Sequence, residues 1–189
     1  TILRRIFTMS NSFTIEENKS LYSAKIKVVG VGGGGGNMIN HIIRENPNLD
    51  IDLMIANTDA KALDNSPAHT KIQLGEKKTK GLGAGMRPEV GKEAAQESYE
   101  EIKSALETSD VVFIASGLGG GTGTGAAPVV AQAAKEIGAL TVAVVTMPFS
   151  FEGKKRSKLA DIGLSELRKE SDSIVIIPND RLLNLIDKK

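Results

Sequence analysis

The sequence of 189 residues contains no cysteine and no tryptophan, and aromatic residues make up only 4% of it. Without cysteine the chain has no disulfide, no thiolate metal site and no thiol nucleophile, which fits a reducing cytoplasm. No apolar run approaches the roughly 20 residues that a membrane-spanning helix needs. No apolar segment follows Arg4 and Arg5, as a secretion signal would require. The formal net charge of +1 and the lack of an extended basic patch give no reason to expect nucleic acid as a partner.

Glycine, by contrast, is abundant and concentrated in two segments. Residues 30–36 hold six glycines and residues 117–125 hold another six, which makes twelve of the chain's 20. Glycine therefore marks particular sites and does not indicate general disorder. No repeat or low-complexity linker divides residues 25–189, so we expect one domain there, preceded by a flexible tail at residues 1–24.

The segment 117–125 is typical of a phosphate-binding turn between a strand and a helix. A β-branched apolar run at 111–116 predicts a buried strand, and the spacing at 129–137 predicts a helix with Pro128 in its first turn and Gly138 just past its end. Such a turn directs free backbone N–H groups and the positive end of a helix dipole at an anion. Thr122 and Thr124 add hydroxyl donors. The segment has no lysine, so it is not a Walker-type loop.

The segment 30–36 lies between an expected strand at 25–31 and an expected helix at 37–46. Its Gly30-x-Gly32-x-x-Gly35 spacing is formally a dinucleotide fingerprint. An alternative is therefore an NAD-binding Rossmann oxidoreductase, with Asp52 or Asp59 on a ribose. One pyrophosphate needs only one glycine-rich turn, however, so two such turns favour a ligand with a longer phosphate chain.

Strands and helices alternate along the whole chain. Further strands are expected at 51–56, 71–74, 140–146 and 173–177, further helices at 88–107, 156–170 and 180–189, and a loop at 75–89. This alternation predicts an α/β fold of Rossmann-like type, with a mainly parallel sheet and helices on both faces. Both glycine segments follow strands, and ligands bind at the carboxyl ends of strands in such sheets.

Seven ordered motifs resemble the nucleotide-binding half of the tubulin/FtsZ family, in particular its FtsZ branch. They are GVGGGGGN, ANTDA, GLGAG, GGGTGTGAAP, TVAVVT, PFSFEGKKR and IPNDRLL. The resemblance covers essentially all of residues 25–189. It departs from the family pattern at Met86 and Arg87, where the family usually has alanine and asparagine, and we assign no phosphate contact to either residue.

The resemblance implies a site for GTP or GDP. The implied binding residues are Gly33, Gly34, Gly35, Gly36, Asn37, Gly120, Gly121, Thr122, Gly123, Thr124, Glu152, Arg156 and Asn179. Glu152 would accept hydrogen bonds from the ribose hydroxyls, Arg156 would approach the nucleotide as a charged donor, and Asn179 would lie near the guanine and sugar. Spacing alone makes Glu152 and Arg156 an ordinary i,i+4 pair. Mg²⁺ would accompany the triphosphate, and no separate metal site is expected.

The family function implied is cytoplasmic GTP hydrolysis coupled to head-to-tail polymerisation. The polymer forms the ring that guides bacterial division at mid-cell, together with other division proteins and without direct insertion into the membrane. In the family, a central helix, an acidic loop that completes hydrolysis on the neighbouring subunit, and a second domain come after the part that this sequence resembles. We therefore expect no complete catalytic site in residues 1–189, weak or no GTP binding, and no hydrolysis or normal polymerisation by this chain alone. A degenerate member with a structural role is a further alternative, against which the intact GGGTGTG, Glu152 and Arg156 argue.

Overall fold

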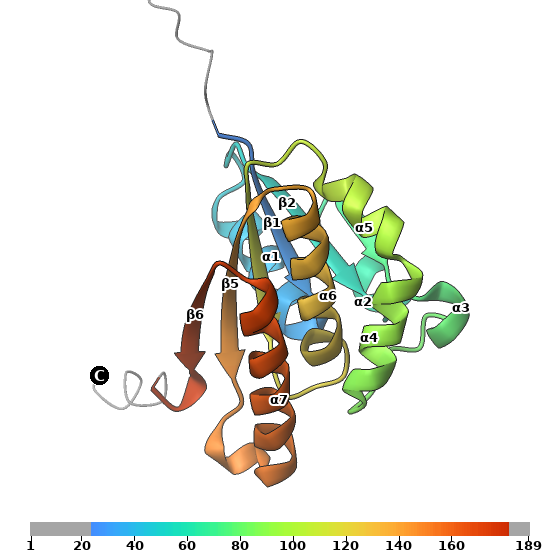
Figure 1. Cartoon of the computed structure of the whole chain (residues 1–189), viewed down its shortest axis with the longest axis vertical. Helices are drawn as coiled ribbons and strands as arrows, with labels where there is room; N and C mark the ends of the chain where they lie inside the picture. Colours follow the sequence, from blue (N-terminus) through green and yellow to red (C-terminus); the bar gives the residue numbers. More distant parts are fainter. Residues whose placement is uncertain (1–23, 182–189) are drawn as a thin grey trace, which may run out of the picture.

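The computed structural model describes residues 24–181 of the chain (Figure 1). The tail expected at residues 1–24 and the helix expected at 180–189 fall almost entirely outside the described residues. Within them, strands and helices alternate from Ile26 to Pro178.

Six strands form one parallel sheet in the order β3-β2-β1-β4-β5-β6. The strands are β1 (Ile26–Val31), β2 (Asp52–Asn57), β3 (Thr70–Gln73), β4 (Val111–Gly117), β5 (Leu140–Met147) and β6 (Ser173–Pro178). The predicted α/β fold with a parallel sheet is confirmed, and each expected strand lies within one residue of its observed bounds. The reason is that β-branched runs buried on both faces of a parallel sheet give a strong local signal.

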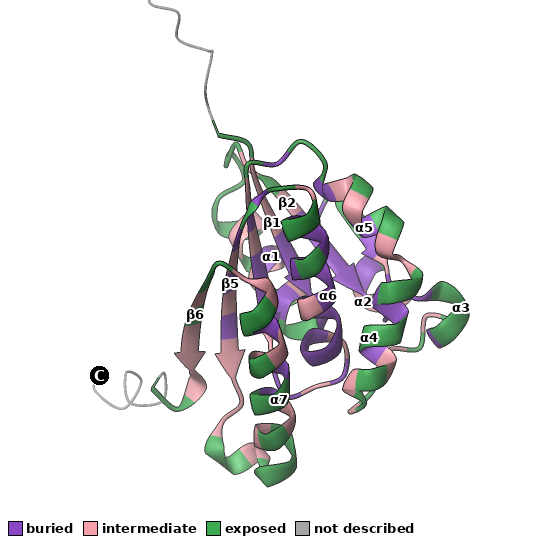
Figure 2. Ribbon diagram, in the orientation of Figure 1, coloured by how far each residue is buried: buried purple, intermediate pink, exposed green. Residues whose placement is uncertain are grey.

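Helices cover both faces of the sheet (Figures 1 and 2). The helices are α1 (Gly32–Glu45), α2 (Ala60–Asp64), α3 (Glu76–Thr79), α4 (Pro88–Glu97), α5 (Tyr99–Leu106), α6 (Thr122–Glu136) and α7 (Lys154–Glu170). On one face α1 and α2 enclose a small core that includes Ile39 and Leu63. On the other face α4 to α7 enclose a larger core, and α6 lies at its centre with most of its residues buried.

Two helices begin earlier than the sequence predicts. The prediction for α1 was a start at residue 37, but the helix begins at Gly32, directly after β1. The prediction for α6 placed Pro128 in the first turn, but the helix begins at Thr122 and Pro128 lies inside it. Both predictions were wrong for the same reason: they treated glycine as a helix breaker, whereas tertiary packing here overrides that weak preference. Gly138, just past the end of α6, does have the expected positive φ of 81°.

The single helix expected at 88–107 is two helices, α4 and α5, separated at Ser98. The Ser98 hydroxyl donates to the carbonyl of Gln73 (3.2 Å) and accepts from the amide of Gly75 (3.0 Å). Because these bonds attach Ser98 to the end of β3, the helix axis is interrupted there. The short helix α3 occupies part of the loop expected at 75–89, and α7 begins at Lys154, two residues before the expected 156.

Candidate nucleotide site

The sheet register brings both glycine segments to one edge. Strands β1 and β4 are parallel neighbours, and Val31 lies opposite Ser116. The Ser116 hydroxyl donates to the Val31 carbonyl (3.3 Å), which holds the two strand ends level. Helix α1 leaves this edge toward one face and α6 toward the other, so the strand order reverses here. Such a switch point is where open α/β sheets bind ligands.

The two glycine segments contact one another directly. A Cβ on Gly32 would lie 2.7 Å from the Gly123 nitrogen, and a Cβ on Gly34 would lie 2.9 Å from the Gly117 Cα. Either side chain would force the segments apart. The glycines therefore allow the N-termini of α1 and α6 to converge at the same point, where their dipoles favour a negative charge.

The segment 117–125 is held in shape by hydroxyl groups. The Gly119 amide donates to Thr124 Oγ1 (2.8 Å), and the hydroxyls of Thr58 and Thr122 share a 2.6 Å hydrogen bond. The bond from the Gly125 amide to the Gly121 carbonyl (3.0 Å) is the i to i−4 bond that opens α6. The N–H groups of the preceding residues have no partner within the helix, which is the arrangement that binds phosphate.

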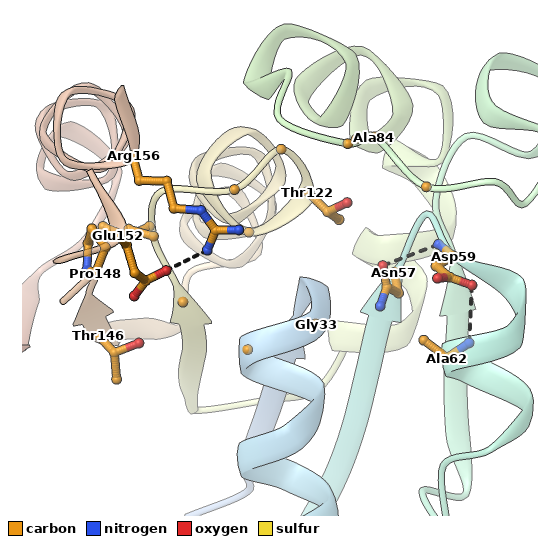
Figure 3. Close-up of a pocket in the computed structure, with 18 of the residues that line it drawn as sticks. Gly33, Asn57, Asp59, Ala62, Ala84, Thr122, Thr146, Pro148, Glu152 and Arg156 are labelled. Carbon is orange, nitrogen blue, oxygen red and sulfur yellow. Dashed lines mark hydrogen bonds and ion pairs between the residues drawn. The ribbon is translucent and has the colours of Figure 1, made fainter. Parts of the chain in front are cut away.

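A cavity of about 530 Å³ lies in front of these helix ends. Its lining residues come from every loop at the carboxyl edge of the sheet: Gly33, Gly34, Asn57, Asp59, Ala62, Leu82, Gly83, Ala84, Gly85, Gly117, Leu118, Gly120, Gly121, Thr122, Gly123, Thr146, Pro148, Glu152, Arg156 and Asn179. Figure 3 shows Glu152 and Arg156 on one side, Asn57 and Asp59 on the other, and Gly33 and Thr122 between them. A volume of this size suits one nucleotide.

Glu152 and Arg156 form an ion pair at the cavity wall (Figure 3). Arg156 Nη1 donates to Glu152 Oε2 over 2.6 Å. The other carboxylate oxygen, Oε1, accepts from the Phe149 amide (2.9 Å) across the short 3-10 turn Ser150–Glu152. The predicted i,i+4 pair is thus present, and both of its members line the cavity.

Asp59 and Asn57 fix the opposite wall. Asp59 caps α2, because its Oδ1 accepts from the amides of Lys61 (2.9 Å) and Ala62 (3.2 Å). Asn57 Oδ1 accepts from the Asp59 amide (3.2 Å). The ANTDA motif thus supplies the cap of α2, and both residues also line the cavity.

The structure brings most, but not all, of the sequence-predicted site residues to the cavity. Those that line it are Gly33, Gly34, Gly120, Gly121, Thr122, Gly123, Glu152, Arg156 and Asn179. Gly35 is buried, where a Cβ would meet the Ala115 carbonyl oxygen, and Thr124 is buried beneath the segment 117–125. Gly36 and Asn37 lie further along α1 and are absent from the cavity lining. Met86 and Arg87 do not line it either.

Sequence reasoning left several lining residues out of the predicted site. Thr146 and Pro148 flank the carboxyl end of β5, and Gly83, Ala84 and Gly85 belong to the loop before α4. The signal was available, because any residue that follows a strand of a parallel sheet lies at the same edge. Loop residues carry no periodicity that says which of them turn inward.

Neither histidine lies in the cavity lining. Over residues 24–181, no three His, Asp or Glu side chains are grouped as a metal site requires. In the same range, no helix combines the length and the apolar character needed to cross a bilayer.

An all-parallel sheet with two helix N-termini converging at its switch point defines an α/β nucleotide-binding domain. A family model described as the GTPase domain of the Tubulin/FtsZ family matches residues 25–187. The chain therefore belongs to this family, and its fold is that of the family's GTPase domain. Guanine nucleotide is accordingly the ligand class that the family implies, and the NAD alternative loses its support.

Solved structures agree with this assignment. An empty FtsZ dimer from M. jannaschii is 51% identical, with a TM-score of 0.85, over 89% of this chain and 49% of that one. CetZ1 from Haloferax volcanii, a GDP-bound monomer, is 27% identical (TM-score 0.76, 82% of this chain and 51% of that chain). CetZ2 from the same organism, a GTPγS-bound protofilament, is 26% identical (TM-score 0.75, 82% and 49%). The chain thus spans about half the length of these relatives.

Proposed function

We propose that residues 25–189 form one domain that binds GTP and GDP in the cavity described above. The observation that carries this proposal is the convergence of two helix N-termini, α1 and α6, on one cavity that also contains Glu152 and Arg156. Two N-termini offer separate sets of N–H groups, which suits a chain of two or three phosphates. The phosphates lie against the residues from Gly120 to Gly123 and against Gly33 and Gly34, all of which line the cavity.

The remaining roles follow from chemistry. Glu152 has a carboxylate that can accept two ribose hydroxyls once it exchanges its bond to Arg156 for them. Arg156 then donates to the nucleotide, and Asn179, with an amide that both donates and accepts, recognises the base or sugar. Thr124 acts from beneath, through its bond to the Gly119 amide.

Mg²⁺ fits this site as a companion of the triphosphate. Among the described residues that line the cavity, Asp59 and Glu152 are the carboxylates, and Glu152 is ion-paired. Mg²⁺ commonly takes most of its ligands from phosphate oxygens and water and one or two from carboxylates, so Asp59 is the residue placed to contribute. The ion would offset negative charge that the helix ends neutralise only in part.

We also propose that the complete protein assembles head to tail with copies of itself at this edge. Two large apolar side chains are exposed beside the cavity: Leu82, which lines it, is 86% exposed, and Phe151, next to Glu152, is 73% exposed. Burying these two side chains against a second copy would remove apolar surface from water and so favour association. The solved FtsZ dimer and the CetZ2 protofilament support self-association.

In this proposal the complete protein hydrolyses GTP in the cytoplasm, and its filament forms the ring that guides bacterial division at mid-cell with other division proteins. The chain of residues 1–189 alone binds nucleotide weakly and does not hydrolyse it. In the proposed complex Glu152 accepts the ribose hydroxyls, and Asp59 caps α2 through Oδ1 and contributes to Mg²⁺. Neither of the carboxylates that line the described cavity is then left as a general base for water. Steady phosphate release by this chain would contradict that expectation.

Calorimetric titration with GTP, GDP, ATP and NAD, each with Mg²⁺, tests the proposed ligand. Guanine-selective binding is the expected result, and binding of NAD instead of GTP would refute the proposal.

The Glu152→Gln variant tests the proposed ribose contact. Glutamine accepts hydrogen bonds less strongly than a carboxylate and ends the ion pair with Arg156, so we expect GTP affinity to fall by about tenfold. Affinity for 2′-deoxy-GTP should fall less. Glu101→Gln, an exposed change on α5, is the matched control and should leave both affinities unchanged. Equal losses for the two nucleotides would argue against a contact between Glu152 and the 2′-hydroxyl.

A further inference from the structure

Gly163 lies in the middle of α7 and is buried. Glycine is the least favourable residue for a helix interior apart from proline. Gly163 does not have a positive φ, so the backbone at this position would accept alanine. The presence of glycine there needs another physical reason.

The reason is the close approach of α7 to α6. A Cβ on Gly163 would lie 2.5 Å from Thr124 Cγ2 and 3.2 Å from the Thr124 carbonyl oxygen. Thr124 is only 2% exposed and belongs to the first turn of α6. The two helices therefore pack through the methyl group of Thr124, and there is no room for a second methyl between them.

The other branch of Thr124 holds the glycine segment above it. Its Oγ1 accepts the hydrogen bond from the Gly119 amide (2.8 Å). The methyl and the hydroxyl share one carbon, so any rotation about χ1 moves both. The contact with Gly163 therefore also determines where the hydroxyl points.

Helix α7 contacts the same segment a second time near its start. Gly119 has a φ of 107°, and a Cβ there would lie 3.1 Å from the Arg156 carbonyl oxygen. The segment 117–125 is thus supported by α7 at Arg156 and, through Thr124, at Gly163. A displacement of α7 would disturb both supports together.

We propose that Gly163 is a positioning residue for the nucleotide site. It keeps α7 close enough to hold the Thr124 side chain in the rotamer that binds the Gly119 amide. This bond sets the shape of the segment that receives the phosphates. The expected effect on GDP binding rests on the proposed function, whereas the expected effect on the hydrogen bond between Thr124 and Gly119 does not.

The Gly163→Ala variant tests the proposal. Alanine favours helix α7, yet its methyl group must displace the Thr124 methyl. We expect the Gly119 amide to exchange its hydrogen at least about tenfold faster by NMR, because its acceptor is moved. Calorimetry should show GDP affinity reduced by about tenfold as well.

The double variant Gly163→Ala/Thr124→Ser is the decisive comparison. Serine keeps the hydroxyl and lacks the methyl, so the 2.5 Å clash is removed while the acceptor remains, and the closest approach left is 3.2 Å to the carbonyl oxygen of residue 124. Exchange at Gly119 and GDP affinity should both return to within about threefold of the Thr124→Ser single variant. A merely structural role for Gly163 predicts a change in the free energy of unfolding, with exchange at Gly119 and GDP affinity unchanged in the folded chain. Ser165→Ala, an exposed change two residues along α7, controls for altered helix propensity.

The possible results distinguish a failure of this inference from a failure of the proposed function. Unchanged exchange at Gly119 in a folded Gly163→Ala variant would overturn the inference. So would a double variant that does not fold or that behaves like Gly163→Ala. If the unaltered chain binds no guanine nucleotide, the proposed function fails, and the Gly119 exchange rates still decide this inference.

Discussion

The two glycine-rich helix starts reach the same point by different means. The start of α1 consists of glycine alone, and Gly33 and Gly34 are exposed. The start of α6 is mostly buried and is held by hydroxyl bonds, by α7, and by the loop before α4, where a Cβ on Gly121 would overlap the Gly85 carbonyl oxygen. In α1 the lack of side chains allows the helix to approach the sheet and α6 closely. The start of α6 is, in addition, held in position by contacts from neighbouring elements. Glycine therefore occurs in these helix starts for more than one physical reason, and single substitutions can separate these reasons.

The largest effect is expected at Gly35. A Cβ there would overlap the Ala115 carbonyl oxygen and approach the backbone of Gly30, so α1 could no longer lie against β1 and β4. Neither neighbour is a flexible side chain that could turn away. Gly35→Ala should therefore lower the free energy of unfolding by about 3 kcal/mol, measured by urea denaturation. A loss below about 1 kcal/mol would show that α1 packs less tightly than its glycines imply.

How far the sequence could predict this site depends on the kind of residue. The strands were predictable, and so was their common edge, because buried β-branched runs have a local signature. The start of α1 was not, since it depends on the positive φ of Gly32 (71°) and on the close packing of Gly32 and Gly35 against Gly123 and Ala115, far away in the chain. The break at Ser98 is of the same kind, because its cause is a pair of hydrogen bonds to Gln73 and Gly75.

The site residues also divide into those that the sequence could identify and those whose role depends on the folded structure. Motif resemblance brought out Glu152 and Arg156, and both line the cavity. It could not distinguish Thr122, which lines the cavity, from Thr124, which supports the segment from beneath. Two threonines in the same motif differ only in the direction that the helix gives them, and this direction depends on where α6 begins.

A smaller effect is expected at Thr58, which tests the support of α6. Thr58 is fully buried, and its hydroxyl bonds that of Thr122 (2.6 Å). Thr58→Val keeps the shape and removes this bond, so the unfolding free energy should fall by about 1 kcal/mol. Thr70→Val, at an exposed position of β3, is the matched control and should change stability by less than about 0.5 kcal/mol. Equal changes for the two variants would mean that the hydroxyl pair contributes nothing to the support of α6.

The smallest effect, of opposite sign, is expected at Gly36. It is the immediate neighbour of Gly35 in α1, yet a Cβ there would meet no atom within 4 Å. With no clash, only the intrinsic preference of the helix remains, and alanine is favoured over glycine by up to about 1 kcal/mol. Gly36→Ala should therefore raise the midpoint of urea denaturation slightly, whereas Gly35→Ala lowers it strongly. If Gly36→Ala also destabilised the chain, α1 would be sensitive to alanine in general, and close packing at Gly35 would no longer be needed to explain its glycine.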